Sequence, residues 1–365
     1  MKIQEVINCL EDFAHRSLQE DYDNAGLIIG NAEEDCFGIL TTLDVTEKII
    51  EEAIQKKCNL IVAHHPIIFR GLKKINGKNY VERTVISAIK NNIAVYAIHT
   101  NLDNVLNGVN FKIAQKLKLK DIQVLSSKEN TLKKLVTFSP QANAGEIRNA
   151  LFEAGAGAIG NYSECSYNIE GAGTFKAGKE AEPYIGKIGE RHTEIETRIE
   201  VIFPSYMQKL IVESLVKTHP YEEVAYDIYP LVNTSNDIGS GITGNLAEPL
   251  SEENLLSLLK KEFGLKVVRH TALLHKKIAK IALCGGAGSF LISAAKNSGA
   301  DAYITSDVKY HEFFDADNTI FLADIGHYES EQFTIELLAE ILQQKFPNFA
   351  VLKTELSTNP VEYYV

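Results

Sequence analysis

Short apolar runs alternate with amphipathic segments in the first and last thirds of the chain. The runs have the length of strands, and the longer segments repeat apolar residues at helical spacing. In the first third, strands are expected at residues 37–45, 59–65 and 93–100 and helices at 46–57, 80–92 and 108–119. In the last third, strands are expected at residues 277–286, 300–307 and 319–327 and helices at 288–299 and 329–346. This alternation is typical of α/β folds and predicts parallel or mixed sheets covered by helices.

The middle of the chain, from about residue 133 to 231, shows a different pattern. Its expected strands are longer and alternate between apolar and polar residues, as at 196–204 and 223–231. Two segments with helical spacing, 144–155 and 206–219, lie among these strands. The order predicts a compact α+β module of the βαββαβ, ferredoxin-like kind.

We interpret the middle module as an insertion into a single domain built from both ends. The predicted fold class is therefore α/β (α+β overall), with a discontinuous α/β domain at residues 1–128 and 235–365 and the inserted module at residues 129–234. The glycine-rich segment 236–246 is interpreted as a return linker. Three consecutive domains are the alternative.

Length, charge and cysteine content narrow the class of protein. A chain of 365 residues with 45% hydrophobic residues can fill more than one core. Its 37 basic and 48 acidic residues give a net charge of -11 without a Lys/Arg-rich block, so no duplex nucleic acid partner is expected. Five scattered cysteines suit a reducing compartment, and we expect a cytoplasmic protein. The N-terminus has an amphipathic helical pattern, and no apolar run reaches membrane-spanning length, so no membrane association is expected.

Two adjacent histidines end the apolar run LIVAHHPIIF, residues 60–69. Neighbouring side chains on a strand point to opposite faces, but Pro66 interrupts the regular alternation. Both imidazoles can then lie at one end of the sheet and aim in different directions. This arrangement favours two separate metal ions, with His64 on one and His65 on the other. The alternative is that the pair only caps a turn.

The next expected strand ends in HTNLDN, which contains His99 and Asp103. Consecutive strands are often neighbours, so these residues are expected at the same sheet edge as the histidine pair. Asp103 is a candidate metal ligand, although the same letters also suit an ordinary turn. For His99 we favour a position behind the ligands, supporting one of them, over a ligand or a simple strand-end histidine.

A third strand end, GHYESE, supplies His327 and Glu331. If a helix begins near Tyr328, these two residues are four apart on one face and can share a site. Glu329 should then point elsewhere. The alternative is that Glu329 and Glu331 only complement the positive start of the helix.

The three strand ends together offer nitrogen and oxygen ligands without a thiolate. Such a set suits zinc, manganese, iron or nickel and is large enough for two ions. Two ions can bridge and acidify a water molecule, so hydrolysis through a metal-bridging hydroxide is the expected reaction class.

Two other segments at strand ends have less definite interpretations. The glycine-rich segment 282–290 lacks the lysine and spacing of phosphate-binding loops, so a tight turn is expected there. Lys309 and His311 are candidates for proton transfer or for neutralising phosphate, or they are ordinary polar residues of a surface helix.

Several motifs occur in an order that carries a family resemblance. They are YDNAGL (22–27), LDVT (43–46), VAHHP (62–66), HTNLD (99–103), SDVKYH (306–311) and GHYESE (326–331). With them the chain resembles the Nif-three-like family, whose bacterial members are often labelled GTP cyclohydrolase I type 2 homologues. The segment 218–231 resembles the signature of the family's optional PII-like or CutA-like insert. Tyr22 departs from the family pattern, which usually has tryptophan there.

The resemblance implies a dinuclear metal centre with Glu331 as the bridging carboxylate. Its implied ligands are His64, His65, Asp103, His327 and Glu331. It implies two divalent ions per subunit, with zinc expected first and manganese, iron or nickel as alternatives. It also implies a toroidal homohexamer whose metal sites face an internal cavity.

The implied activity is metal-dependent hydrolysis of a nucleotide or a related phosphorylated heterocycle. In GTP, attack at C8 of the purine would open the imidazole ring and release formate. His99, Lys309 and His311 are the candidates for the acid and base steps that follow. The alternative is a non-enzymatic regulatory or metal-handling protein whose inserted module binds a small molecule or a partner.

Overall fold

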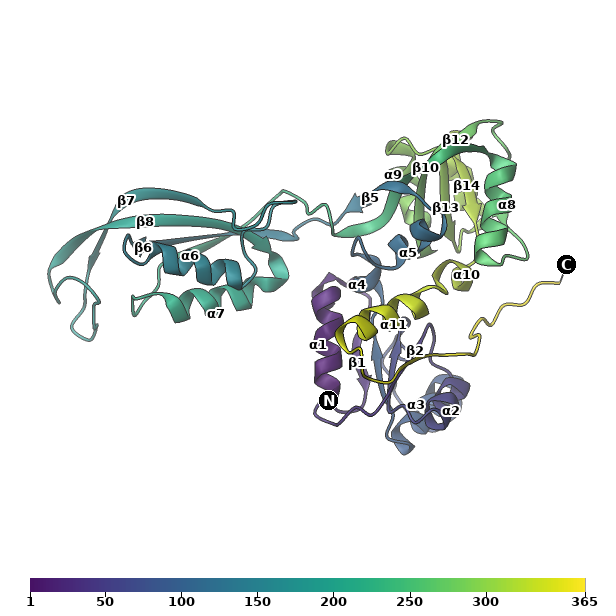
Figure 1. Cartoon of the computed structure of the whole chain (residues 1–365), viewed down its shortest axis with the longest axis horizontal. Coiled ribbons are helices and arrows are strands. Elements are labelled where there is room, and N and C mark those ends of the chain that lie inside the picture. Colours follow the sequence, from purple (N-terminus) through teal and green to yellow (C-terminus); the bar gives the residue numbers. More distant parts are fainter. Residues whose placement is uncertain (365) are drawn as a thin grey trace. The chain divides into compact units, whose positions relative to one another are not determined.

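The computed structural model describes residues 1–364 and divides into two compact units. One unit combines both ends of the chain, Met1–Ser127 and Asp237–Val365, and the other is Lys128–Asn236. In Figure 1 the purple and blue N-terminal elements and the yellow and green C-terminal elements belong to the first unit, and the teal elements form the second. The two ends of the chain therefore fold together.

The first sheet of the larger unit has five strands in the order β1-β4-β3-β2-β15. Its strands are β1 (Gly26–Ile29), β2 (Ile39–Thr42), β3 (Leu60–Ala63), β4 (Ala94–Ala97) and β15 (Val351–Lys353). The four strands from β4 to β15 run parallel, and β1 pairs antiparallel with β4. The sheet is mixed, as expected for an α/β pattern.

Helices cover both faces of this sheet, which explains the nearly continuous apolar character of its strands. The helices are α1 (Ile3–Phe13), α2 (Glu47–Gln55), α3 (Tyr80–Lys90) and α11 (Thr334–Lys345). Leu40 and Ile61 share a buried cluster with residues of α2 and α3. Ile39 and Leu60, one position away, share another with residues of α1 and α11. The strict alternation of strand side chains thus builds two cores.

The second sheet of the larger unit has six strands in the order β11-β14-β13-β12-β10-β5. Its strands are β5 (Lys120–Ser127), β10 (Gly239–Ser251), β11 (Arg269–His270), β12 (Lys277–Ala287), β13 (Ala302–Ser306) and β14 (Phe321–Asp324). The neighbouring pairs β12–β13 and β13–β14 are parallel, and the other neighbouring pairs of this sheet are antiparallel. The accompanying helices are α4 (Thr100–Asp103), α5 (Val109–Lys116), α8 (Glu252–Phe263), α9 (Ile292–Asn297) and α10 (His327–Glu331).

Two glycine-rich segments differ from expectation because both belong to strands of this sheet. The expected linker at residues 236–246 forms most of β10, which pairs with β5 and β12. Its glycines permit close backbone approach, since a Cβ on Gly239 would lie 2.2 Å from the Ser126 carbonyl oxygen. The expected tight turn at 282–290 is instead the end of β12, where the register shifts between Leu283 and Ala287, followed by a 3-10 helix.

The inserted unit folds as a four-stranded antiparallel sheet with two helices. Its elements follow the order β6 (Leu132–Pro140), α6 (Ala144–Glu153), β7 (Tyr167–Lys176), β8 (Arg191–Pro204), α7 (Gln208–Thr218) and β9 (Tyr226–Pro230). The sheet order is β7-β8-β6-β9, and all pairs are antiparallel. Ile147 and Ile211 of the helices share a separate buried cluster with Leu135, Ile199 and Val201 of the sheet.

No helix among the described residues has both the length and the apolar character needed to cross a membrane. All five cysteines have free thiols.

Candidate metal centre

The candidate metal ligands lie where strands of the larger unit end. His64 and His65 directly follow β3, and Asp103 closes the short helix α4 after β4. His327 begins α10, which follows β14 of the second sheet after Gly326. Sites in α/β proteins commonly form at the carboxyl ends of strands because the loops there converge. Both sheets therefore contribute side chains to one site.

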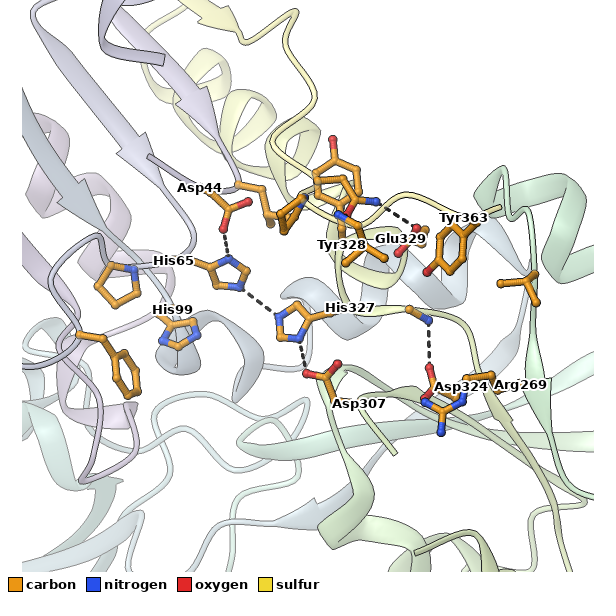
Figure 2. Close-up of a pocket in the computed structure, with 18 residues that line it drawn as sticks. Asp44, His65, His99, Arg269, Asp307, Asp324, His327, Tyr328, Glu329 and Tyr363 are labelled. Carbon is orange, nitrogen blue, oxygen red and sulfur yellow. Dashed lines mark hydrogen bonds and ion pairs between the residues drawn. The ribbon is translucent and has the colours of Figure 1, made fainter. Parts of the chain in front are cut away.

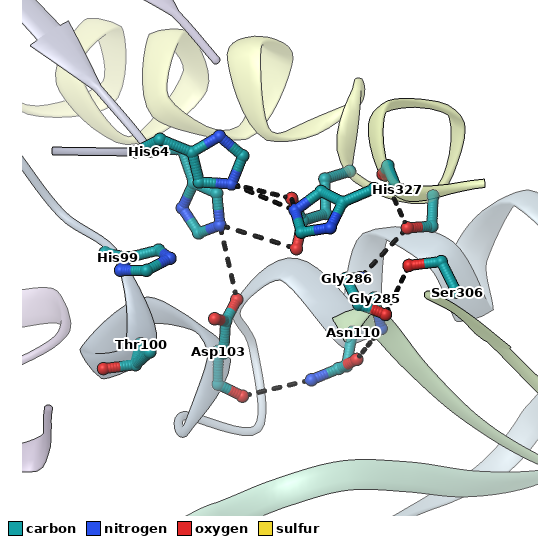
Figure 3. Close-up of polar contacts among 12 residues, drawn as sticks. His64, His99, Thr100, Asp103, Asn110, Gly285, Gly286, Ser306 and His327 are labelled. Atoms are coloured by element: carbon teal, nitrogen blue, oxygen red, sulfur yellow. Dashed lines mark hydrogen bonds and ion pairs between the residues drawn. The ribbon is translucent and has the colours of Figure 1, made fainter. Parts of the chain in front are cut away.

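Glu331 lies at the centre of this site and connects two groups of side chains. Its Oε2 is 3.0 Å from Nε2 of His65 and 3.0 Å from Nε2 of His327. Its Oε1 is 3.9 Å from Nε2 of His64, and that nitrogen is 3.6 Å from Oδ1 of Asp103. Figure 3 shows His64 and Asp103 facing each other. The five predicted ligands thus form two groups that share one carboxylate, and each group could hold a metal ion.

The buried nitrogen of His64 supports the fit to a cation. His64 is 0% exposed, and its Nε2 has no hydrogen-bond partner. A buried polar atom without a partner is costly, so such an atom needs an explanation. A cation between His64, Asp103 and Glu331 would bind this nitrogen. Imidazole nitrogens and carboxylate oxygens also suit zinc and similar divalent metals.

Each of the three candidate histidine ligands has its Nδ1–H held by an acceptor, while its Nε2 faces the central groups. Nδ1 of His64 donates to the Ile98 carbonyl oxygen at 2.9 Å. Nδ1 of His65 donates to Asp44 at 2.8 Å, and Nδ1 of His327 donates to Asp307 at 2.7 Å. In Figure 2 the rings of His65 and His327 face each other, and Asp44 and Asp307 contact the outer end of each ring. Such contacts fix the tautomer and orient metal-binding histidines, so Nε2 is the nitrogen available to a metal.

The sequence did not indicate Asp44 and Asp307 as supports of these histidines. Asp44 lies in LDVT and Asp307 in SDVKYH, two of the motifs that carried the family resemblance. Asp307 has a φ of 55°, an uncommon conformation for a residue other than glycine. A carboxylate just after an apolar strand was the available signal, but it is also ordinary turn chemistry.

The pKa values of the central side chains favour bound protons at positions that a metal cation could take. Burial lowers the pKa of His65, but hydrogen bonds to Asp44 and Glu331 outweigh burial and raise it to about 10. Burial is likewise outweighed at His327, where Asp307 and Glu331 raise the pKa to about 11. Burial and repulsion from Glu331 raise the pKa of Asp103 to about 7. Histidines that bind a metal must release these protons.

His99 lies beside the two groups and is held from behind by Asp23. Its ring centroid is 5.2 Å from that of His64 and 5.3 Å from that of His65. Its Nδ1 donates to Asp23 at 2.7 Å. Burial raises the pKa of Asp23, but hydrogen bonds from His99 and Thr100 outweigh it and keep that pKa well below its usual range. One ring nitrogen of His99 is close enough to His64 and His65 for a ligand role as well as a supporting one.

Gly286 and Asn110 position the central groups without belonging to them. A Cβ on Gly286 would lie 2.2 Å from Oε1 of Glu331, so glycine leaves the space that this carboxylate occupies. The Asn110 side chain donates to the Asp103 carbonyl oxygen at 3.1 Å and accepts the Gly285 N–H at 2.9 Å. Figure 3 shows this connection between the Asp103 helix and the end of β12. The glycine-rich segment therefore contributes to the site.

Two pockets open onto the centre. The larger has a volume of about 580 Å³ and includes His65, His99 and His327 in its wall, together with residues 359–361 near the C-terminus. The other has a volume of about 470 Å³ and includes His99, Asp103 and Glu331. Both volumes lie in the range of small-molecule sites. Among the described residues that line them, Arg269 is the one lysine or arginine, and Asp324 pairs with it at 3.0 Å.

The remaining candidates lie away from the centre. Lys309 is exposed, 3.9 Å from Glu312, and His311 packs against Tyr310 and Phe314. Neither lines the two pockets, so the structure does not bring them to the candidate ligands. Glu329 points away from the central groups, as expected, and accepts a hydrogen bond from Asn359 at 3.0 Å.

Sequence comparisons identify relatives over almost the whole chain. The family described as "Duf34/NIF3 (NGG1p interacting factor 3)" matches residues 1–360. A Bacillus subtilis protein named "GTP cyclohydrolase 1 type 2 homolog" is 37% identical over 99% of this chain and 98% of its own length. A Halalkalibacterium halodurans protein of the same name is 39% identical over 99% of this chain and 98% of its own.

Solved structures show the same fold. A Bacillus cereus protein described as related to NIF3 is 36% identical, covers 100% of this chain and 99% of its own, and has a TM-score of 0.87. A Staphylococcus aureus protein is 28% identical with the same coverage and has a TM-score of 0.79.

Proposed function

The chain belongs to the Duf34/NIF3 family, and from this membership and the site geometry we propose that it is a metal-dependent hydrolase with a dinuclear centre. The observation that carries the proposal is the pair of side-chain groups that share Glu331, one of which contains the buried, unpartnered Nε2 of His64. Glu331 would bridge the two ions. His64 and Asp103 would hold one ion, and His65 and His327 the other.

The bound ions, which we propose to be zinc, would act as Lewis acids that activate water and polarise the substrate. The protein would supply the orientation of the ligands and a proton carrier. His99 is suited to carry a proton because it lines both pockets and its Nδ1–H is held by Asp23 at 2.7 Å, which orients the ring. Lys309 and His311 remain predictions for this role, without support from the pocket geometry.

The names of the relatives point to GTP as the first substrate to test. The larger pocket can accommodate a heterocycle, but four carboxylates, Asp44, Asp307, Asp324 and Glu329, line it. They would repel a triphosphate, and Arg269 is already paired with one of them. Phosphate binding in this pocket would therefore depend on the bound cations.

Formate release from GTP tests the proposal. Protein loaded with two ions should release formate, and Glu331→Gln should stop the release because the bridging charge is lost. Glu336→Gln is the matched control, since Glu336 is a half-buried residue of α11 that pairs with Lys116 of α5 at 3.5 Å. No release by the loaded protein would contradict the GTP assignment. No hydrolysis across a broad panel of nucleotides and phosphoesters would contradict the reaction class.

The alternative is a regulatory or metal-handling protein in which the ions are structural. It predicts that chelation lowers the melting temperature and dissociates the assembly. An unchanged melting temperature and an intact assembly after chelation would count against structural ions. A lowered melting temperature and a dissociated assembly, together with no hydrolysis by the loaded protein, would favour this alternative over the hydrolase.

The inserted unit is proposed to be a ferredoxin-like module. Its βαββαβ order and its strand order β7-β8-β6-β9 support this assignment. The five free thiols support a reducing, cytoplasmic location.

We also propose a homohexameric ring, as the family resemblance implies. Exposed aromatic side chains support an interface, with Tyr310 71% and Phe314 67% exposed on the 3-10 helix Tyr310–Ala316. Light scattering should give six times the chain mass of 40.5 kDa. The double variant Tyr310→Ser, Phe314→Ser should lower that mass. A monomeric wild-type protein would contradict the ring.

A further inference from the structure

The inserted unit contains a pocket of its own, with a volume of about 440 Å³. All residues of its wall belong to Lys128–Asn236, so it is separate from the candidate metal centre. The wall combines the end of β7, the β7–β8 connection and the α7–β9 connection with Phe138 of β6 and Glu196 of β8. Its volume suits a small molecule.

Aromatic rings form one side of this pocket. The ring centroid of Tyr221 lies 6.1 Å from that of Tyr184 and 6.5 Å from that of Phe175. These separations are typical of interacting aromatic side chains. Tyr184 is nevertheless 58% exposed, so much of its surface is available to a ligand. Aromatic faces carry negative potential and attract cations.

A carboxylate lies among these rings, and the chain leaves room for it. Oε1 of Glu196 accepts a hydrogen bond from the Tyr221 hydroxyl at 2.8 Å. Oε2 of Glu196 lies over Gly173, where an added Cβ would be 2.1 Å away. The hydrogen bond between Tyr221 and Glu196 joins the α7–β9 connection to β8. Glu196 is therefore held in the pocket wall by specific contacts on two sides.

The other charged residues of the wall are also acidic. Glu222 and Glu223 line the pocket, and none of the described lining residues is a lysine or arginine. Glu222 accepts the Glu182 N–H at 2.7 Å, which ties the two connections together. An anion entering this pocket would meet carboxylates without a compensating charge, whereas a cation would meet carboxylates and aromatic faces.

We propose that the inserted unit binds an organic cation, with a quaternary or protonated amine on a flat apolar body. The charged group lies near Glu196, and the apolar body packs against Tyr184, Phe175 and Tyr221. The proposal does not depend on the chemistry of the metal centre, because the two sites share no residue.

Two probes of similar size and opposite charge test this proposal on the full chain. Phenyltrimethylammonium should bind, as measured by titration calorimetry and by a change in tyrosine fluorescence, which the lack of tryptophan makes readable. Benzenesulfonate should not bind. Equal binding of both probes, or no binding of the cation at millimolar concentration, would overturn the proposal.

Substitutions of pocket residues test whether the cation binds in the pocket of the inserted unit. Glu196→Gln should weaken binding by about fivefold or more, because a partly exposed charge pair is lost. Tyr184→Ala should weaken it similarly, and this exposed residue can be replaced without disturbing a core. Glu170→Gln is the control, because its exposed carboxylate lies on the same sheet outside the pocket. Unchanged affinity in Tyr184→Ala and in folded Glu196→Gln would place the cation elsewhere and contradict the assignment.

Discussion

The candidate centre depends at the residue scale on how each imidazole is held. His64, His65, His99 and His327 each donate Nδ1–H to an oxygen, from Ile98, Asp44, Asp23 and Asp307 respectively. Each ring is therefore held in one orientation before any cation arrives, with Nε2 as the nitrogen left for a metal. This preorganisation reduces the conformational cost of binding a metal.

Replacement of Asp44 by asparagine tests the importance of this support. Asp44→Asn leaves every proposed ligand in place but weakens the acceptor that orients His65, so cation affinity should fall by about 10- to 100-fold. Competition with a chelator measures the affinity. Asp35→Asn is the control, since the exposed side chain of Asp35 pairs with Lys2 at 3.0 Å and lines neither pocket of the candidate centre. Equal loss in both variants would argue against an orienting role.

His219 gives the inserted unit a pH dependence. Its Nε2–H donates to the Phe138 carbonyl oxygen at 2.9 Å, and its Nδ1 accepts the Tyr221 N–H at 3.1 Å, so the ring is neutral. Burial lowers the pKa of His219 from 6.5. In the unfolded chain the His219 imidazole therefore takes up a proton near pH 6.5, whereas in the folded unit it does so only at a lower pH.

The stability that His219 contributes should be complete above about pH 6.5 and decrease as the pH falls toward the lowered pKa. Amide hydrogen exchange, corrected for intrinsic rates, should show loss of protection in α7 and β9 on going from about pH 7.5 to 5.5. His219→Gln should remove most of this pH dependence. Protection that stays constant over the range in the unaltered chain would contradict the assignment.

The sequence indicated the candidate ligands better than their supports. His64, His65, Asp103, His327 and Glu331 were expected together because three strand ends were expected to converge and because the family resemblance implies this ligand set. Asp44, Asp23 and Asp307 were not identified because a single aspartate after a strand resembles any turn. Long-range contacts with a histidine, rather than local spacing, distinguish them.

At the scale of elements, the end of β12 was the segment least accessible to sequence reasoning. Glycines at 285, 286 and 288 suggested a turn, but close packing against Glu331 and the neighbouring strand requires them. The prediction of a linker at 236–246 was wrong for the same reason, because β10 is glycine-rich where other backbones approach it. Glycine permits both turns and close contacts, and the pattern alone does not separate the two.

Gly286→Ala tests the role of the β12 end. Gly286 has a φ of 63°, and its new Cβ would collide with Glu331, so bound cations should be lost. Gly264→Ala is a matched control, because Gly264 has a φ of 66° with open space around it. The control should lose about 1 kcal/mol of folding stability and keep its metal. Metal analysis after gel filtration distinguishes the two, and full metal content in Gly286→Ala would contradict the packing argument.

At the scale of the whole molecule, the candidate centre requires both ends of the chain. His65 and Glu331 are 266 positions apart, yet their side chains are 3.0 Å apart. The alternating pattern indicated α/β structure at each end, but periodicity does not show that two distant segments meet. The contact follows from the packing of α5, α10 and α11 between the two sheets, which share one continuous core.

Anomalous diffraction tests the central claim most directly. Data should be collected at the zinc, manganese, iron and nickel edges from crystals grown without added metal. The expected result is two peaks per chain on either side of Glu331, one beside His64 and Asp103 and the other beside His65 and His327. A single peak, or one ion bound by both His64 and His65, would contradict the dinuclear arrangement.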